Sequence, residues 1–235
     1  MVFASHPLIW HELESVESTQ DVAAELVRTG GAGDIVLAHH QTSGRGRLGR
    51  TWHADPGDSL AMSLIFREEV PYEKPYLLGM ALAIAAAGIA HAQLRWPNDI
   101  VIGERKVGGV LTEMVRNSEG VSVPVVGIGL NLNQATFPPQ IDLIATSLHL
   151  AHGGQYSARE VAEQILTRMS SLPEPKSWAD LAPIWGLFDR TRGKNYRLAS
   201  GEEAVGLGIG SDGQLLCAVN GESRAILAAE AIFGS

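Results

Sequence analysis

Cysteine is almost absent from this sequence, and its scarcity limits the chemistry available to the chain. Cys217 is the only cysteine in 235 residues, which excludes an internal disulfide and a cysteine-based zinc site. The eight histidines include no His-Glu-x-x-His spacing, and the pair His149 and His152 is weak support for a metal site. The fold must therefore rest on an apolar core, for which 45% hydrophobic residues are sufficient.

Positive charge and long hydrophobic runs are scarce as well. Lysine and arginine total 18 against 26 aspartates and glutamates, and the resulting net charge of −8 argues against general binding to nucleic acid or acidic membranes. The uncharged stretch Leu77–Ala90 is rich in alanine and shorter than the ~20 residues of a membrane span, which favours a buried helix. The start of the chain, Met1–Pro7, shows no secretory signal. We therefore expect a soluble, cytoplasmic protein.

Apolar periodicity and turn residues predict a mixed α/β fold of the α+β type, with helices packed on a mixed sheet. Helices are expected after the N-cap residue Ser18, over Tyr76–Ala90, after the capping box at Ser157, and over Ser177–Leu187. Strands are expected over Leu8–Glu14, Asp34–Gln41, Ser59–Phe66, Gln93–Trp96, Ile100–Ile102, Lys106–Arg116 and Val121–Leu132. The last two have a turn signal between them, which predicts an antiparallel hairpin.

Near its C-terminal end the sequence changes to short apolar runs separated by turn residues. Asp212-Gly213 and Asn220-Gly221 are strong hairpin turn signals. They separate three short apolar runs, Ala204–Ile209, Gln214–Val219 and Ser223–Leu227. This spacing predicts a small β barrel. We place a boundary near Asp189, giving a first domain of residues 1–188 and a second of residues 189–235.

The segment Gly44–Arg50 interleaves three arginines with three glycines. The arginine fork binds phosphate or carboxylate through two hydrogen bonds, and glycine lets the backbone approach a ligand closely. A solvated basic hairpin loop is the alternative. The segment also matches Gly-x-Gly-x-x-Gly, but that dinucleotide motif opens a helix. Here the loop Thr42–Asp58, which includes Pro56, leads into an expected strand, so the sequence disfavours a dinucleotide site.

Two further clusters are candidates for binding an anion or a close neighbour. Arg95–Asp99 ends in an amide and a carboxylate, and Lys106 follows next to Gly108 and Gly109, where a lysine could reach an anion across open backbone. An ordinary hairpin with an exposed lysine is the alternative. Gly127–Asn131 places small residues in a buried strand, which indicates close packing against its backbone by a ligand or a core neighbour.

Taken in order, these motifs resemble those of the biotin–protein ligases over most of the first 190 residues. The matching residues are Ser18-Thr19, Gln41, the Gly-Arg-Gly-Arg-x-Gly-Arg-x-Trp segment 44–52, Trp-Pro-Asn-Asp at 96–99, Arg-Lys-x-x-Gly at 105–109 and Gly-Ile-Gly-Leu-Asn at 127–131. The sequence departs from the family pattern at three positions. These are Gln20 in place of asparagine, which affects contact with the ureido ring, Leu48 in place of a basic residue, and Arg95 in place of lysine.

The resemblance implies a class II synthetase-like catalytic domain with a C-terminal SH3-like barrel. It also implies an activity that joins the biotin carboxylate to the α-phosphate of ATP, releases pyrophosphate, and passes biotin to a lysine of a biotin carboxyl carrier protein. ATP and biotin are the implied substrates, with Mg²⁺. The chain is expected to bind neither DNA nor membrane and to be a monomer or homodimer. The Ser-Thr motif begins at residue 18, so we expect no N-terminal DNA-binding domain and no repressor function.

The resemblance also assigns roles to residues, with Arg47 and Lys106 as the catalytic pair. The implied biotin-binding residues are Ser18, Thr19, Gln20, Gln41, Arg45, Gly46, Arg47, Lys106 and Gly109. The implied nucleotide-binding residues are Arg45, Arg47, Arg50, Trp52, Asn98, Lys106 and Asn131, with Trp52 stacking on adenine. Metal ligands are not assigned.

Two other functions remain open on the sequence. A lipoyl or octanoyl transferase or ligase shares the fold class but is expected to lack the arginine loop of residues 44–52. A non-catalytic regulator that binds biotin or a nucleotide would not turn over its ligands. Biotin-dependent exchange of pyrophosphate into ATP separates the biotin ligase from both.

Overall fold

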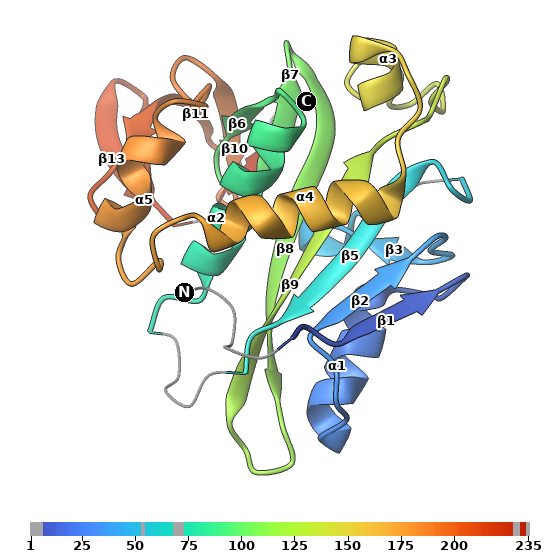
Figure 1. Cartoon of the computed structure of the whole chain (residues 1–235). Helices are drawn as coiled ribbons and strands as arrows, with labels where there is room; N and C mark the ends of the chain where they lie inside the picture. The colour runs from blue at the N-terminus through green and yellow to red at the C-terminus, as the bar shows by residue number, and fades with distance from the viewer. Residues whose placement is uncertain (1–6, 53–54, 68–72, 228–230, 234–235) are drawn as a thin grey trace.

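A seven-stranded mixed sheet forms the centre of the computed structural model, which describes residues 7–52, 55–67, 73–227 and 231–233 (Figure 1). Its strand order is β1-β2-β5-β9-β8-β7-β6. The bounds are Trp10–Leu13 (β1), Ile35–Ala38 (β2), Ser59–Ile65 (β5), Gln93–Arg95 (β6), Asp99–Ile102 (β7), Arg105–Arg116 (β8) and Ser122–Asn131 (β9). Only β1 and β2 pair in parallel, and β8 and β9 form the predicted antiparallel hairpin. The predicted α/β class is confirmed.

The strands bury side chains on both faces of this sheet. In β2, Ile35 and Leu37 join the larger apolar cluster while Val36 joins a smaller one on the opposite face. In β9, Val126 and Ile128 belong to the larger cluster and Val125 to the smaller. Successive strand residues point to opposite faces, so this alternation requires cover on both sides of the sheet.

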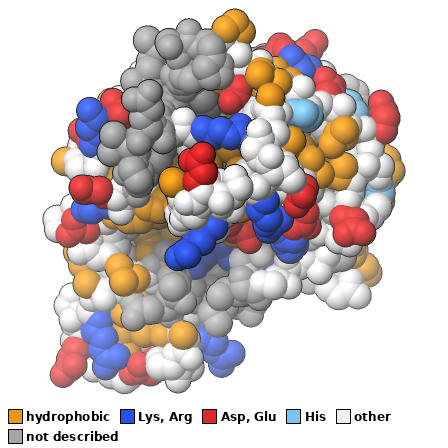
Figure 2. All heavy atoms as spheres, turned by 90° about the horizontal axis from the view of Figure 1, so that it is seen from below, with side chains coloured by type: hydrophobic (Ala, Val, Ile, Leu, Met, Phe, Trp, Pro, Cys, Tyr) orange, Lys and Arg blue, Asp and Glu red, His pale blue; other side chains and the backbone are white. Residues whose placement is uncertain are grey.

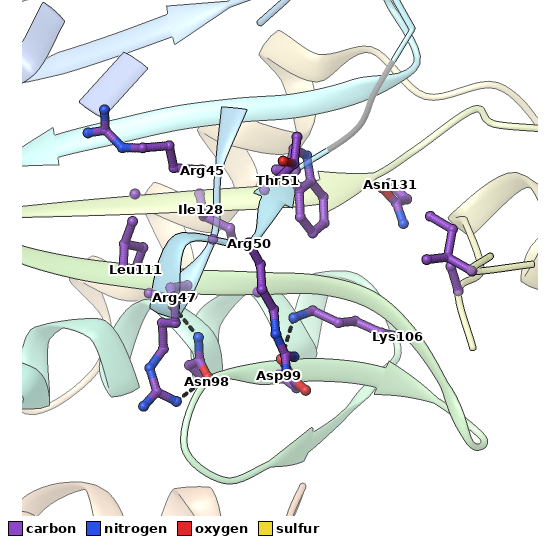
Figure 3. Close-up of a pocket in the computed structure, with 18 of the residues that line it drawn as sticks. Arg45, Arg47, Arg50, Thr51, Asn98, Asp99, Lys106, Leu111, Ile128 and Asn131 are labelled. Carbon is purple, nitrogen blue, oxygen red and sulfur yellow. Dashed lines mark hydrogen bonds and ion pairs between the residues drawn. The ribbon is translucent and has the colours of Figure 1, made fainter. Parts of the chain in front are cut away.

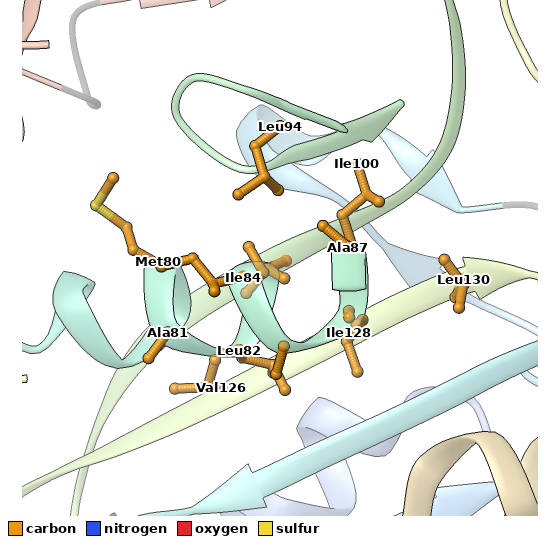
Figure 4. Close-up of a cluster of buried hydrophobic side chains, with 14 of the residues drawn as sticks. Met80, Ala81, Leu82, Ile84, Ala87, Leu94, Ile100, Val126, Ile128 and Leu130 are labelled. Carbon is orange, nitrogen blue, oxygen red and sulfur yellow. The ribbon is translucent and has the colours of Figure 1, made fainter. Parts of the chain in front are cut away.

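Helices α2 (Tyr76–Ile89) and α4 (Ala158–Ser170) cover the face of the larger cluster (Figures 1 and 4). The residues from Leu77 to Ala87 of α2 are all buried, and Leu82 points toward Val126 and Ile128 of β9 while Ile84 points to the opposite side of the helix. The Ser157 hydroxyl accepts a hydrogen bond from the Glu160 amide, as the predicted N-cap of α4 requires. No helix in the described ranges has both the length and the apolar character needed to cross a membrane.

Helix α1 (Thr19–Thr29) covers the opposite face, where it packs on β2, β5, β9 and β8. Ala23 and Val27 of the helix are buried in the smaller cluster, and Gly30 ends the helix with a positive φ of 70°, as predicted. Ser18 is the N-cap of this helix, as predicted, and has the extended backbone of a cap. Its side chain makes no cap hydrogen bond: the amide of Asp21, the third helical residue, donates to the Ser18 backbone carbonyl at 3.1 Å, and the Thr19 amide donates to the Gln41 side chain.

The C-terminal segment forms helix α5 (Trp178–Trp185) and a five-stranded antiparallel sheet, ordered β13-β12-β11-β10-β14. Its strands are Asn195–Leu198 (β10), Glu203–Ile209 (β11), Leu215–Val219 (β12), Glu222–Ile226 (β13) and Ala231–Phe233 (β14). The three predicted runs correspond to β11, β12 and β13, and Gly213, Asn220 and Gly221 have the positive φ that these turns need. The sequence analysis missed β10, β14 and the short helix α3 (Leu148–His152).

The C-terminal sheet shares an apolar core with the rest of the chain. Tyr196, Leu215 and Cys217 belong to the same buried cluster as Trp96 and α2. The Trp96 indole N–H donates to the Gly213 carbonyl at 2.8 Å. The division into domains 1–188 and 189–235 therefore stays a prediction, and residues 1–6 with the start of the expected N-terminal segment lie outside the described residues.

Candidate active site

A cavity of about 600 Å³ lies on the α1 face of the central sheet, where α1, β8 and β9 meet. The volume is within the usual range for a small-molecule site. The following predicted site residues all line this cavity: Ser18, Thr19, Gln20, Gln41, Arg45, Gly46, Arg47, Arg50, Trp52, Asn98, Lys106, Gly109 and Asn131. The fold thus brings together residues that are up to 113 positions apart in the sequence, Ser18 and Asn131 being the outermost.

Two neighbouring strands form the floor of the cavity because of their register. Gly109 of β8 pairs with Gly129 of β9, and Leu111 pairs with Gly127, so these residues share the α1 face. A Cβ atom on Gly129 would come within 2.6 Å of the Trp52 ring, and one on Gly127 within 2.8 Å of the Gln20 amide. The glycines predicted to allow close packing therefore do so, and their neighbours are two predicted ligand-binding side chains.

Amide and hydroxyl groups form the end of the cavity next to α1. The Gln41 Oε1 accepts hydrogen bonds from the Thr19 amide at 2.7 Å and from the Thr19 hydroxyl at 3.1 Å. The Ser63 hydroxyl donates in turn to the Thr19 hydroxyl at 2.9 Å. Because the Gln41 oxygen is already engaged, its NH₂ group is the end available to a ligand.

The arginine segment forms a short hairpin at the cavity wall. It consists of β3 (Gly44–Arg45), a single 3₁₀ turn over Arg47–Gly49, and β4 (Thr51–Trp52). The segment opens no α-helix, which agrees with our rejection of a dinucleotide motif. Part of the expected loop, residues 53–54, lies outside the described residues.

Trp52 closes one side of the cavity near β9. Its ring lies against Gly129, and its indole Nε1 is buried without a hydrogen-bond partner among the residues that the structure describes. A buried donor without a partner is rare in folded proteins. This indole is therefore able to donate to a ligand that fills the cavity.

Cationic side chains meet polar ones in the middle of the cavity (Figure 3). The Lys106 Nζ lies 2.5 Å from Asp99 Oδ1, and Arg47 Nη1 donates to Asn98 Oδ1 at 3.2 Å. Burial lowers the pKa of the Arg47 guanidinium from its ordinary value, Asp99 opposes this effect, and Arg50 adds to it. Arginine nevertheless keeps its proton in proteins, so the centre of the cavity is positively charged.

Arg45 lies differently from the other arginines of the hairpin. Its Nη1 contacts both oxygens of Asp21 on α1, at 2.6 and 2.7 Å, and its Nη2 lies 3.6 Å from Glu113 Oε2. The hydrogen bond to Asp21 raises the pKa of the Arg45 guanidinium. Although Arg45 lines the cavity, its charge is already paired on the α1 side.

The far end of the cavity combines one amide with apolar side chains. The Asn131 Nδ2 donates to the Thr146 carbonyl at 2.9 Å. Phe137, Ile141, Ile144 and Ala145 complete this wall. This segment was not predicted from the sequence, whose signal for it is the adjacent apolar pair Leu143 and Ile144 in a turn-rich stretch. In the structure these two residues are 78% and 51% exposed.

The described residues contain no group of three or more His, Cys, Asp or Glu side chains that could hold a metal ion. The ring nitrogens of His149 and His152 contact the backbone carbonyls of Gly154 and Ala90, at 2.7 and 3.1 Å. On the face shown in Figure 2, basic and acidic side chains of the described residues lie next to one another.

Comparison with known proteins gives consistent matches over nearly the whole chain. A model of the Biotin/lipoate A/B protein ligase family matches residues 12–131. The bifunctional ligase/repressor BirA of Bacillus subtilis is 35% identical over 97% of this chain and 74% of its own length. The biotin--[acetyl-CoA-carboxylase] ligase of Mycobacterium tuberculosis is 28% identical over 95% of this chain and 89% of its own.

The same resemblance holds in three dimensions. The structure of the biotin protein ligase from Aquifex aeolicus in complex with biotin and ATP superposes with a TM-score of 0.76 at 29% identity. The match covers 95% of this chain and 97% of the Aquifex chain.

Proposed function

Since the chain belongs to the Biotin/lipoate A/B protein ligase family, we propose that it is an ATP-dependent biotin–protein ligase. It joins the biotin carboxylate to the α-phosphate of ATP, which releases pyrophosphate. It then transfers the biotinyl group from biotinyl-5′-AMP to a lysine of a biotin carboxyl carrier protein. The solved structure it resembles is that of a ligase in complex with biotin and ATP, which supports this assignment.

The order of chemical groups along one cavity carries the proposal. Amide and hydroxyl groups stand at the α1 end, Arg47 and Lys106 stand in the middle, and Trp52 with Asn131 stands at the far end. Biotinyl-AMP has the same order, with a ureido head group, an acyl phosphate and an adenine. We assign the three regions of the cavity to those three groups.

The α1 end favours biotin over lipoate or octanoate. A cyclic urea carries N–H donors and a carbonyl acceptor that can pair with the amides of Gln20 and Gln41. A dithiolane ring or an alkyl chain carries neither, and it would leave the buried Gln20 oxygen without a donor, at a cost of about 1–3 kcal/mol, and the Gln41 NH₂ group without an acceptor. The same difference argues for a biotin enzyme within a family that also handles lipoate.

The first step forces two anions together, and the central cations make this possible. The Lys106 ammonium lies beside the backbone of Gly109 and can move from the Asp99 carboxylate to the oxygens of the reacting groups. Arg47 stabilises the charge on the phosphate through its fork. Mg²⁺ brought in with ATP would supply further positive charge at the phosphates, and it would need few protein ligands there.

The second step needs no nucleophile from the enzyme. The neutral carrier amine attacks the acyl carbon, the bond between that carbon and the phosphate oxygen breaks, AMP leaves with the electron pair, and the amine nitrogen releases one proton to water. The 44–52 hairpin lies over the middle of the cavity and limits the access of water, which would otherwise destroy the mixed anhydride.

The carrier of acetyl-CoA carboxylase is the acceptor we propose, since the Mycobacterium relative is named for it. The decisive experiment measures exchange of labelled pyrophosphate into ATP with biotin, lipoate or octanoate present, followed by labelling of the carrier domain. Exchange that depends on biotin alone supports the proposal. Exchange driven by lipoate or octanoate would assign the chain to the other branch of the family, and binding of biotin without exchange would make it a regulator.

A further inference from the structure

Glu113 of β8 touches the candidate biotin site from outside the cavity. Its Oε2 accepts a hydrogen bond from Gln20 Nε2 at 2.8 Å, and the same oxygen lies 3.6 Å from Arg45 Nη2. Its side chain is 41% exposed, so it is not needed to fill the core. One carboxylate thus links α1, β8 and the arginine hairpin.

This carboxylate decides how the Gln20 amide is turned. An ionised carboxylate only accepts hydrogen bonds, so the end of the amide that faces Glu113 must be the NH₂ group. The Gln20 oxygen then lies on the side of Gly127, where a Cβ atom would come within 2.8 Å of it. Gln20 is only 5% exposed, and both Gln20 and Gly127 line the cavity.

The Gln20 oxygen is, beside the Gln41 NH₂ group, a polar group at this end of the cavity that a ligand can reach. It is buried and accepts no hydrogen bond from the residues that the structure describes. A buried carbonyl without a donor is costly, so a ligand N–H is the partner that this arrangement lacks.

We propose that Glu113 is a positioning residue for biotin recognition, one that holds the Gln20 amide so that its oxygen accepts a hydrogen bond from a ureido N–H. The inference rests on the proposed function, since it takes biotin as the ligand. Without the carboxylate, the neighbouring Arg45 guanidinium attracts the Gln20 amide oxygen, and the Gln20 NH₂ group turns toward the ligand. The NH₂ group then faces the ureido N–H, and two hydrogen-bond donors meet.

The test compares Glu113→Gln with Glu119→Gln, the same change in the β8–β9 turn away from the cavity. We expect Glu113→Gln to raise the KM for biotin about tenfold, because an amide at position 113 offers a donor as well as an acceptor and no longer fixes which end of the Gln20 amide faces it, which costs the hydrogen bond between the Gln20 oxygen and biotin. The kcat, the KM for ATP and the Tm should stay close to those of the parent, as they should for Glu119→Gln. Glu113→Asp, which keeps the carboxylate, should restore part of the affinity for biotin.

Two further measurements isolate the Gln20 contact. Two carbamate analogues of biotin exist, in each of which oxygen replaces one of the two ureido N–H groups. The analogue that lacks the N–H facing Gln20 should bind the parent about tenfold more weakly than biotin, and the difference in affinity between the two analogues should vanish in Glu113→Gln. In a protein that already carries Gln20→Met, adding Glu113→Gln should not raise the KM for biotin further. Gly127→Ala, which displaces the amide from its other side, should raise the KM for biotin even if Glu113→Gln does not fold.

The outcomes separate the inference from the proposed function. If the parent shows no biotin-dependent exchange, the proposed function fails and the inference with it. If the parent exchanges but Glu113→Gln keeps the parent's KM for biotin, or the effects of Gln20→Met and Glu113→Gln simply add, only the role of Glu113 is overturned.

Discussion

At the scale of single residues, the site depends on charges that are already paired before any ligand arrives. Lys106 is held by Asp99, whose side chain is only 10% exposed, and Arg45 is held by Asp21 and Glu113. Such pairs hold long side chains in place and keep like charges apart. The cations that we propose contact the substrates are therefore positioned by the fold itself, and a substrate anion has to displace a carboxylate from them.

Lys106→Ala should abolish most adenylate formation while the chain stays folded. Removing one group that stabilises transition-state charge costs about 3 kcal/mol, or a hundredfold or more in rate. Biotin-dependent pyrophosphate exchange measures this, with circular dichroism as the check of folding. Lys176→Ala removes an exposed lysine outside the cavity and should exchange normally. A folded Lys106→Ala protein with parental exchange would remove Lys106 from the mechanism.

Gly129→Ala should weaken the binding of ATP more than that of biotin. The added methyl group would lie within 2.6 Å of the Trp52 ring, and a rigid indole cannot give way as a flexible side chain can. Overpacking of this kind costs about 1–3 kcal/mol, so the KM for ATP should rise about tenfold or more. Calorimetric titration with ATP and with biotin compares the two effects. An equal loss for both ligands would argue against Trp52 as the adenine platform.

At the scale of elements, the β3–β4 hairpin carries Arg47 over the middle of the cavity. Its single 3₁₀ turn and the positive φ of 72° at Gly49 give it few internal hydrogen bonds compared with an α-helix. A short element of this kind can move between an open and a closed position at low cost. We expect it to close over the intermediate and to open for the carrier lysine.

Arg47→Gly should release the adenylate as well as slow its formation. Loss of a charged, two-pronged contact costs about 1.5–3 kcal/mol, so affinity for biotinyl-5′-AMP should fall roughly tenfold to a hundredfold. Escaped adenylate would acylate exposed lysines, and a streptavidin blot should show labelled serum albumin with the variant but not with the parent. Arg47→Lys, which keeps the charge without the fork, should lie between the two. Parental affinity with labelling of the carrier alone would give the hairpin another role.

At the scale of the whole molecule, the apolar core continues across the predicted boundary near residue 189. The backbone of Leu94 in β6 bonds to Phe188 at 2.8 Å and to Arg190 at 2.7 Å, so the linking segment extends the edge of the central sheet. The C-terminal sheet in turn accepts the indole N–H of Trp96, two residues before the site residue Asn98.

A shortened protein of residues 1–188 should fold with reduced stability. It would leave the Trp96 donor without its partner Gly213 and uncover apolar side chains, for a loss of about 3–5 kcal/mol, or about 10 °C in Tm. Differential scanning calorimetry measures this loss. Trp96→Phe in the full chain, which removes the donor and part of the buried ring but keeps the C-terminal sheet, should lower Tm by a few degrees. An unchanged Tm on truncation would show that the two parts are energetically independent.

Much of this fold follows from local sequence signals. Every strand predicted before residue 133 is a member of the central sheet, and the turns Asp212-Gly213 and Asn220-Gly221 lie where they were predicted. Strand alternation and turn chemistry are local, so they can be read from a few neighbouring residues. Strands β10 and β14 could not be predicted in this way, because they are short and pair with each other although three other strands lie between them in the sequence.

The site shows the same division. The sequence by itself determined which side chains to expect at the site, since the order of its motifs placed Arg47, Lys106 and Asn131 among the candidates and all three line the cavity. Only the tertiary structure decided how they are oriented: Arg45 turns to Asp21, Lys106 rests on Asp99, and Glu113 directs the amide of Gln20. Each of these contacts joins residues from different elements, and such pairs are fixed by sheet register and helix packing, which no local pattern records.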